Sequence, residues 1–462
     1  MILSKNYNAK ERRDLLFSKG ARICFLGIGG VSMHALAHFC LFRGVYVFGA
    51  DKTESAYTRR LEDLGVRVFI PAAGAAIESA SAVVCSLAMD EGNGDVMRAR
   101  AKNIPILTRG ELLGALMEEY TLSVAVSGTH GKSTVTAMLA SVLCGAARDP
   151  SVLCGAALSE GGQCFRMGGK ELLVAEACEY GDSFLSLRPS VSLLLNLEAD
   201  HPDYFRTEDA LTRSFARFAM GSGTVFYFAN CERLRALIEH YGIQNALSVG
   251  SSAACDYRYE IEAMEKGYAT VRFFDGKNAP ASVKLSVPGR FQAENAAMAL
   301  AAASYLGIVP SVAGAALSRF GGIDRRICRI EAYEKIPLYY DYAHHPTQIR
   351  ATVEALRQMH GAKVTVLFRP HTFSRTQALF SAFVSALSEA DRVLITDIDG
   401  ARERGGAVSA ADLASAVGGT YVPLAQAAQM LCEVREGCAV IMGAGELQTV
   451  LARFLGAAEK NG

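Results

Sequence analysis

Short apolar runs alternate with longer amphipathic segments over most of this chain. Apolar and β-branched residues fill 22–26, 45–50, 122–127, 171–177 and 191–197, and most of these runs precede a stretch with apolar residues at helical spacing. Repeated strand–helix alternation is typical of a parallel sheet with helices on both faces. We therefore predict an α/β protein in which several such units follow one another.

The same pattern divides the chain into three blocks. The first ends with a helix near Tyr120, and the second begins with the strand LSVAVSG at 122–128. Between residues 256 and 287 the apolar residues alternate at period two, which predicts an antiparallel insertion. The glycines of FGGID at 320–324 indicate a hinge before the third block. We accordingly expect three domains, at residues 1–119, 120–322 and 323–462.

Composition limits the function classes. Lys plus Arg and Asp plus Glu both number 47, so the formal net charge is zero and a nucleic-acid partner is not expected. The chain lacks an apolar run of membrane-spanning length, and its first residues lack a signal-peptide core, so we expect a cytoplasmic protein without membrane association. The 12 cysteines include no CxxC pair and are expected to be thiols. We expect a monomer or a homodimer.

The stretch SGTHGKST joins the first strand of the second block to a helix-like run. Free backbone N–H groups at such a turn favour an anion, and glycines let phosphate oxygens approach the backbone. The lysine adds a positive charge, and the next hydroxyls suit Mg²⁺. The standard phosphate loop has another glycine where Val126 stands, so this loop is a shortened version, and a merely solvated turn is the alternative. The predicted ATP-binding residues are Gly128, Thr129, His130, Gly131, Lys132, Ser133 and Thr134.

A second glycine-rich turn, GIGGVS at 27–32, also follows a strand and begins a helix. The dinucleotide fingerprint requires a third glycine where Ser32 stands, so it is incomplete. Asp51 ends the next strand, about where a ribose-binding acid would lie. By itself this motif leaves two alternatives open: a turn that serves only packing, and a binding site for a nicotinamide dinucleotide. The separate ATP loop disfavours the nicotinamide site.

Acidic residues and a histidine follow the next two strands of the second block. Glu176 and Glu179 end one apolar strand, and Glu198, Asp200 and His201 follow the other. Ligands gather at the carboxyl ends of strands in open α/β sheets, and oxygen ligands suit Mg²⁺. We therefore predict a magnesium site beside the phosphate loop, although a single acid after a strand is usually a solvated turn residue.

The third block carries a further polar cluster. In DYAHHPTQIR, Asp341, His344 and His345 follow the strand PLYY and precede a helix that begins near Pro346. These residues could serve a site, or they could only begin the helix, since Pro346 already explains its start.

Together these motifs resemble those of the Mur ligases, the ATP-dependent amide-forming enzymes of peptidoglycan precursor synthesis. The matching segments, in chain order, are FLGIGGVSMHALA, GTHGKST, EACEYGDSFL, NLEADHPDYF, PGRFQAENAAMA, GIDRR, DYAHHPT and RPHTFSRT. The resemblance covers nearly the whole chain and is strongest to the alanine-adding branch. It implies a three-domain architecture: a Rossmann-like N-terminal domain that binds the UDP part of the substrate, a central P-loop α/β domain that binds ATP, and a Rossmann-like C-terminal domain that closes over the nucleotide.

The resemblance also implies roles for single residues. For the diphosphate of UDP-N-acetylmuramate it implies Gly27, Gly29, Gly30 and Ser32, with Asp51 nearby. For Mg²⁺ it implies Ser133, Glu176 and His201. For the nucleotide it implies Lys132 at the phosphates, Asn295 near the adenine, and Arg326 and Asp341 after closure. The residues expected to be catalytic are Lys132, Glu176, His201, His344 and Arg326.

The implied reaction uses ATP to join L-alanine to the lactyl carboxylate of UDP-N-acetylmuramate through an acyl phosphate. The chain departs from the family pattern at Cys178, where many members have an acid, and at Arg290–Gln292, which replaces a histidine-containing turn. The segment after His201 has no lysine that could form the carbamate of the later-acting ligases, which favours the alanine-adding branch. Three alternatives remain: the recycling ligase that adds a whole tripeptide, a nucleotide-binding module without catalysis, and a nicotinamide-dependent oxidoreductase.

Overall fold

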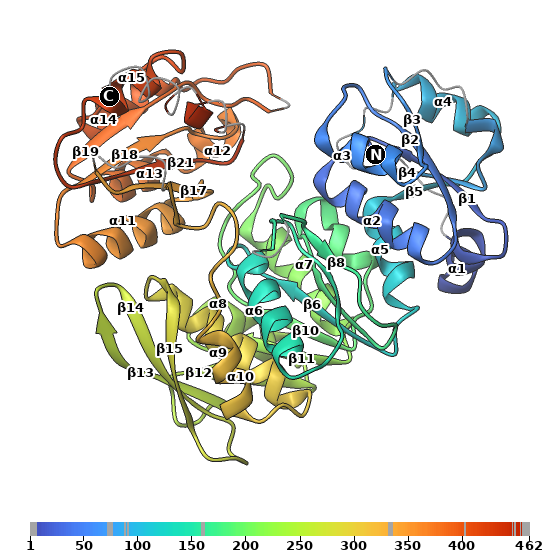
Figure 1. Cartoon of the computed structure of the whole chain (residues 1–462), viewed down its shortest axis with the longest axis horizontal. Helices are drawn as coiled ribbons and strands as arrows, with labels where there is room; N and C mark the ends of the chain where they lie inside the picture. The colour runs from blue at the N-terminus through green and yellow to red at the C-terminus, as the bar shows by residue number, and fades with distance from the viewer. Residues whose placement is uncertain are drawn as a thin grey trace.

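Three sheets, one after another along the chain, organise the structure (Figure 1). This computed structural model describes residues 7–71, 77–86, 89, 92–158, 162–330, 336–401, 403–445, 447, 450–452 and 454. We call the three parts the N-terminal unit (strands β1–β5), the central unit (β6–β15) and the C-terminal unit (β16–β21). The predicted α/β class with three successive blocks is confirmed.

The N-terminal unit is a five-stranded parallel sheet of order β3-β2-β1-β4-β5. The strand order reverses beside β1, so the glycine turn that follows β1 opens into a crevice at the carboxyl edge of the sheet. Its strands are β1 (Arg22–Leu26), β2 (Tyr46–Ala50), β3 (Arg67–Phe69), β4 (Ala82–Cys85) and β5 (Ile106–Thr108). Its helices are α1 (Ala9–Phe17), α2 (Val31–Phe42), α3 (Ala56–Asp63), η1 (Ile77–Ser79), α4 (Gly94–Ala101) and α5 (Arg109–Met117).

The central unit is a ten-stranded sheet of order β15-β14-β13-β12-β11-β10-β6-β9-β7-β8. Strands β13 to β15 pair antiparallel, as their period-two pattern predicts, and they extend below the central unit in Figure 1. The strands are β6 (Leu122–Ser127), β7 (Ser151–Leu153), β8 (Phe165–Arg166), β9 (Leu172–Glu176), β10 (Val191–Leu194), β11 (Thr224–Phe228), β12 (Ala246–Gly250), β13 (Tyr257–Glu265), β14 (Tyr268–Phe274) and β15 (Ala281–Pro288). The helices are α6 (Lys132–Gly145), η2 (Tyr180–Ser186), α7 (Glu208–Met220), α8 (Glu232–His240), α9 (Phe291–Tyr305) and α10 (Pro310–Leu317).

The C-terminal unit is a six-stranded sheet of order β16-β17-β21-β18-β19-β20, in which only β16 is antiparallel to its neighbour. Its strands are β16 (Cys328–Arg329), β17 (Leu338–Asp341), β18 (Val364–Phe368), β19 (Arg392–Ile395), β20 (Thr420–Tyr421) and β21 (Cys438–Met442). Its helices are α11 (Pro346–His360), α12 (Phe373–Ala378), α13 (Phe380–Leu387), α14 (Ala410–Val417) and α15 (Ala427–Cys432).

One apolar core runs through both the N-terminal and the central unit. Buried residues from Leu16 to Ile323 form a single cluster, whereas the C-terminal unit has separate cores on the two faces of its sheet. Two glycines one turn apart on α5 bring this helix against the backbone of η2, because a Cβ at Gly110 would lie 2.6 Å from the Ser183 carbonyl oxygen. The first two units are therefore packed as one body, and the C-terminal unit is a second body.

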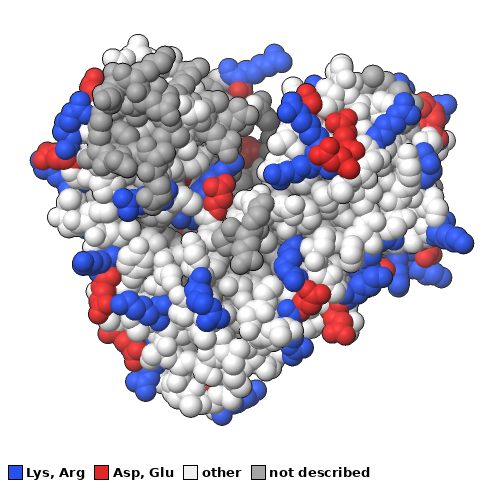
Figure 2. Space-filling view, in the orientation of Figure 1, with Lys and Arg blue, Asp and Glu red and all other residues white. Residues whose placement is uncertain are grey.

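Two sequence-based expectations concern the surface and the cysteines. On the face drawn in Figure 2, basic and acidic side chains both occur around the rim and neither forms a continuous field. Among the described residues, no helix combines the length and the apolar character needed to cross a bilayer. None of the 12 cysteines, all of which lie within the described ranges, forms a disulfide, as expected.

Candidate active site

Two adjoining cavities, of about 330 Å³ and about 350 Å³, lie between the central and C-terminal units. They share four wall residues: His130, Gly131, Arg326 and Gln348. The carboxyl ends of β6 and β10 contribute residues to both cavities and that of β9 lines the second, because parallel strands end at the same edge of a sheet. The phosphate loop and the acidic segments that follow β9 and β10, all three predicted from the sequence to carry functional residues, therefore meet at one place.

The predicted phosphate loop connects β6 to α6. Gly128 and Gly131 have φ values of 142° and 84°, a region in which glycine carries no steric cost. No side chain caps the first turn of the 14-residue helix α6, so its N–H groups remain available to an anion. Asn196 fixes the loop: its Oδ1 accepts from the His130 N–H at 2.8 Å and its Nδ2 donates to the His130 carbonyl at 3.1 Å.

Lys132 lies in a buried charge cluster at the start of α6. Its Nζ is 2.9 Å from Glu179 Oε2 and donates to the Thr129 carbonyl at 3.2 Å. His201 Nε2 lies 3.6 Å from the other Glu179 oxygen. Burial alone would raise the pKa of Glu179, but Lys132 and His201 outweigh burial and lower it. Glu179 is thus a fixed anion that holds the lysine in place. The sequence placed it at the strand end but assigned it no catalytic role.

The predicted magnesium-binding residues all line the second cavity. Ser133 is buried in the first turn of α6, and Glu176 accepts a hydrogen bond from the Gly155 N–H. His201 approaches from the segment after β10 with a left-handed backbone, φ 55°. Cys178, the departure seen in the sequence, lines the same cavity, and burial raises the pKa of its thiol. A hydroxyl and carboxylates near an imidazole are donors that suit a hard divalent cation.

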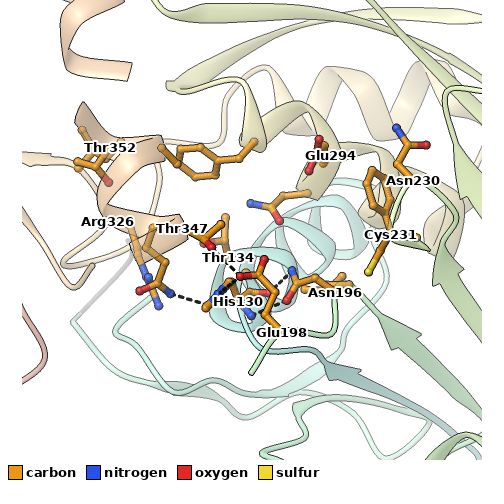
Figure 3. Close-up of a pocket in the computed structure, with 18 of the residues that line it drawn as sticks. His130, Thr134, Asn196, Glu198, Asn230, Cys231, Glu294, Arg326, Thr347 and Thr352 are labelled. Carbon is orange, nitrogen blue, oxygen red and sulfur yellow. Dashed lines mark hydrogen bonds and ion pairs between the residues drawn. The ribbon is translucent and has the colours of Figure 1, made fainter. Parts of the chain in front are cut away.

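The first cavity, shown in Figure 3, is more apolar. Asn295, Thr134 and Arg326 line it together with the aromatic rings of Phe228 and Phe291, a combination that suits a flat base with a few polar edges.

Asp341, also predicted for this region, is buried in the wall of the first cavity. It accepts from the Ala343 N–H at 2.8 Å, the Thr352 hydroxyl at 3.0 Å and the Ile327 N–H at 3.2 Å. Its carboxylate therefore ties the hinge to β17 and α11.

His344 is a half-buried, neutral imidazole that lines the second cavity. Its Nδ1–H donates to the Tyr342 carbonyl at 2.9 Å, which leaves the Nε2 lone pair free of that bond. Burial and then the charge of Arg375 lower the pKa of His344 well below its usual range. A weakly basic nitrogen of this kind is suited to accept a hydrogen bond rather than to keep a proton.

A buried ion pair joins the two bodies next to this site. Arg375 Nε, on α12, donates to Asp200 Oδ1 at 2.7 Å, and both side chains are 5% exposed. The segment RPHTFSRT was among the resembling motifs, but the sequence assigned no role to Arg375. Its partner could not be found by spacing because the two residues lie 175 positions apart.

The glycine turn of the N-terminal unit lies beside the second cavity. Asp51 Oδ2 accepts from the Gly29 N–H at 2.8 Å, and Gly30 begins α2 without a side-chain cap. Of this segment only Val31 lines the cavity itself, together with Tyr57 from α3. The structure therefore places the predicted Gly27, Gly29, Gly30 and Ser32 near the site but outside both cavity walls.

Comparisons with known proteins cover most of the chain. Residues 22–121 match the model "Mur ligase family, catalytic domain", residues 126–303 the "Mur ligase middle domain", and residues 325–446 the "Mur ligase, glutamate ligase domain". The UDP-N-acetylmuramate–L-alanine ligase of Caldicellulosiruptor bescii is 37% identical over 387 residues, which cover 82% of this chain and 84% of that protein.

Solved structures agree with this likeness. The UDP-N-acetylmuramate–alanine ligase of Thermotoga maritima has a TM-score of 0.80 and 25% identity, with 96% of this chain and 100% of that chain covered. A murein peptide ligase of Psychrobacter arcticus has a TM-score of 0.73 and 24% identity, with 95% and 99% covered, and it supports the fold alone.

Proposed function

The chain belongs to the Mur ligase family, and we propose that it is the ATP-dependent ligase that joins L-alanine to the lactyl carboxylate of UDP-N-acetylmuramate in peptidoglycan precursor synthesis. The observation that carries this proposal is the shared cleft. There the uncapped N-terminus of α6, the Lys132–Glu179 pair and His344 face one another across two units. The alanine-adding relatives, similar over more than four fifths of the chain, supply the substrate assignment.

In the first step an oxygen of the lactyl carboxylate attacks the γ-phosphorus of ATP. The bond from this phosphorus to the bridging oxygen breaks, and ADP leaves with that oxygen. Negative charge on the transferring group is stabilised by the Lys132 ammonium and the N–H groups that begin α6, both fixed before the reaction. A partly buried, cationic Lys132 beside Glu179 fits the predicted role at the β- and γ-phosphates.

In the second step the amine nitrogen of L-alanine attacks the acyl carbon, and the carbon–oxygen bond to the phosphate breaks. His344 Nε2 would accept a hydrogen bond from the incoming amine and orient its lone pair, because Nδ1 already donates to Tyr342. The departing phosphate is the stronger base, and it takes the amine proton and leaves as the dianion HPO₄²⁻. An acyl phosphate is hydrolysed by water, so docking of the C-terminal unit protects the intermediate.

The residues of the second cavity fit Mg²⁺. Ser133, Glu176 and His201 would hold it, because they offer mainly oxygen donors at the carboxyl edge of the sheet, and Glu179 lines the same cavity. When bound, the ion neutralises phosphate charge. Gly27, Gly29, Gly30 and Ser32, with Asp51, would form the site for the UDP diphosphate, beside the first turn of α2, which no side chain caps.

We also retain the expected domain boundaries, 1–119, 120–322 and 323–462, since each contains one of the three sheets. A cytoplasmic location and a monomeric or homodimeric state complete the proposal.

Phosphate release tests this function directly. Purified protein is given UDP-N-acetylmuramate and Mg-ATP with L-alanine, glycine, L-serine or the tripeptide in separate reactions. Release that needs both the sugar nucleotide and L-alanine, and that is lost in Lys132→Ala, supports the proposal. Release only with the tripeptide would assign the chain to the recycling branch. ATP binding without release for any amine would indicate a binding module.

A further inference from the structure

Polar side chains from both bodies meet where the two cavities adjoin. His130 and Glu198 come from the central unit, and His345, Thr347 and Gln348 come from the start of α11. The Thr347 hydroxyl donates to Glu198 Oε2 at 2.6 Å, and Gln348 Nε2 donates to His130 Nδ1 at 3.1 Å. His345 Nε2–H donates to the Ala199 carbonyl at 3.2 Å. Figure 3 shows His130, Glu198 and Thr347 side by side at the floor of the first cavity.

The hydrogen bonds fix the proton of His130. The Gln348 Oε1 accepts from the backbone N–H groups of His344 and His345 at 3.0 and 3.3 Å, so the other end of this amide is the NH₂ group. That NH₂ donates to His130 Nδ1, which is therefore unprotonated. The imidazole proton must lie on Nε2, which faces Glu198 Oε2 at 3.5 Å.

The same pattern disfavours a metal ion at this place. One ligand atom each of His130, Glu198 and His345 lies within 4.8 Å of the others, a spacing that a cation could bridge. A cation on His130 Nε2 would require the proton on Nδ1, directly opposite the Gln348 NH₂. The Nδ1 of His345 already accepts from the Thr347 N–H at 3.3 Å. The cluster is therefore a hydrogen-bonded contact between the two bodies.

Glu198 is the charged centre of this contact. Its carboxylate lies at the N-terminus of the 15-residue helix α11, where the helix dipole favours an anion. Burial opposes ionisation, but His130 and Thr347 outweigh it and lower the pKa of Glu198 to about 2. At neutral pH the Glu198 carboxylate is thus fully ionised, and Thr347 of the C-terminal unit donates a hydrogen bond to it.

Glu198 is also tied to the phosphate loop. The Thr129 hydroxyl accepts from the Glu198 N–H at 2.9 Å and donates to the Glu198 carbonyl at 3.1 Å. Glu198 is therefore fixed to the phosphate loop through its backbone and to α11 through its side chain. His130, which follows Thr129 in the loop, belongs to the same contact.

We propose that Glu198 is a positioning residue that couples docking of the C-terminal unit to the shape of the phosphate loop, with Thr347 as the residue that engages it. This inference rests on the proposed function, in which docking keeps water from the acyl phosphate. A loosened contact then has two consequences: the loop binds ATP less well, and the intermediate is lost to water.

A pair of substitutions at one position tests the coupling. Thr347→Val removes the hydroxyl and keeps the shape, whereas Thr347→Ser keeps the hydroxyl. We measure kcat/KM for ATP, the ADP formed per amide with L-alanine present, and phosphate release without any amine. Thr347→Val is expected to lower kcat/KM by about ten- to a hundred-fold, the range for losing a hydrogen bond to a charged group, and to raise ADP per amide above one. Thr347→Ser should remain close to the unmodified protein.

The coupling is overturned if Thr347→Val keeps the original ADP-to-amide ratio and kcat/KM, or if Thr347→Ser loses as much as Thr347→Val. Small-angle scattering in the presence of Mg-ATP measures the radius of gyration, and so reports docking of the C-terminal unit independently of catalysis. An expanded Thr347→Val beside a compact Thr347→Ser supports the contact, and equal radii contradict it. Failure of the unmodified protein to form amide would instead refute the proposed function.

Discussion

Replacing Arg375 by alanine is expected to weaken docking of the C-terminal unit severely. The substitution removes the guanidinium that pairs with Asp200 at 2.7 Å in a site where both side chains are 5% exposed. Burial would raise the pKa of Asp200, but His201 and Arg375 hold it well below its usual range, so Asp200 is an anion. In Arg375→Ala this anion remains buried while the bodies are docked.

The magnitude follows from the burial of the pair. Breaking a buried pair by removing one partner costs about 3–5 kcal/mol, because the remaining charge stays desolvated without an opposite charge to compensate it. Asp200 regains water when the C-terminal unit moves away, so the cost appears as weaker docking rather than as global unfolding. At about 1.4 kcal/mol per factor of ten, docking should fall by roughly two to three and a half powers of ten.

The assay compares two arginines. Arg350→Ala breaks a pair of similar length, 2.6 Å to Glu389, whose side chains are 46% and 43% exposed, and should cost at most about 1 kcal/mol. We expect kcat/KM for ATP to fall at least a hundred-fold in Arg375→Ala and less than about five-fold in Arg350→Ala. Adding Asp200→Asn to Arg375→Ala should restore part of the docking seen by scattering, because the unpaired charge is gone. Equal, small effects of both arginine substitutions would refute the reasoning.

Three further predictions concern the N-terminal and central units. Lys132→Ala should lower kcat by at least about a hundred-fold in the phosphate-release assay, with an unchanged far-ultraviolet circular dichroism spectrum. The folded-state pKa of Glu179 is lowered, so its charge stabilises the fold above the ordinary carboxyl pKa of about 4.3, and this contribution is lost as the pH falls below that value. The difference in Tm between the unmodified protein and Glu179→Gln should therefore be full at pH 7 and shrink below pH about 4.3. A Cβ at Gly29 would lie 2.9 Å from Asp51 Oδ2, so Gly29→Ala should raise KM for UDP-N-acetylmuramate and leave KM for ATP unchanged in steady-state kinetics.

Features that depend on residues close to one another in the sequence could be predicted from the sequence. The period-two segment at 256–287 forms antiparallel strands, and the strand–turn–helix of the phosphate loop forms where the glycines stand. In both cases local backbone preferences and burial on one face act over a few residues. The identity of the family was likewise carried by short motifs in order.

Contacts between the two bodies could not be predicted in this way. Gln348 and His130 lie 218 positions apart, and their hydrogen bond exists only because two separately cored bodies dock in one orientation. Glu176 and Glu179 illustrate a local limit. Glu176 ends β9 and Glu179 follows it, but only the turn into η2 decides that Glu179 is the one that meets Lys132.

The separate core of the C-terminal unit has a thermodynamic consequence. The N-terminal and central units share a continuous apolar cluster, whereas the C-terminal unit has its own cores and meets the central unit through charges, hydrogen bonds and the ring of Phe291. Opening this interface leaves both sets of cores intact, so it should carry a smaller heat-capacity change than unfolding either body does. The balance between open and closed forms should therefore change less with temperature than folding does, and it should respond to ionic strength, since salt screens the charges once water reaches them.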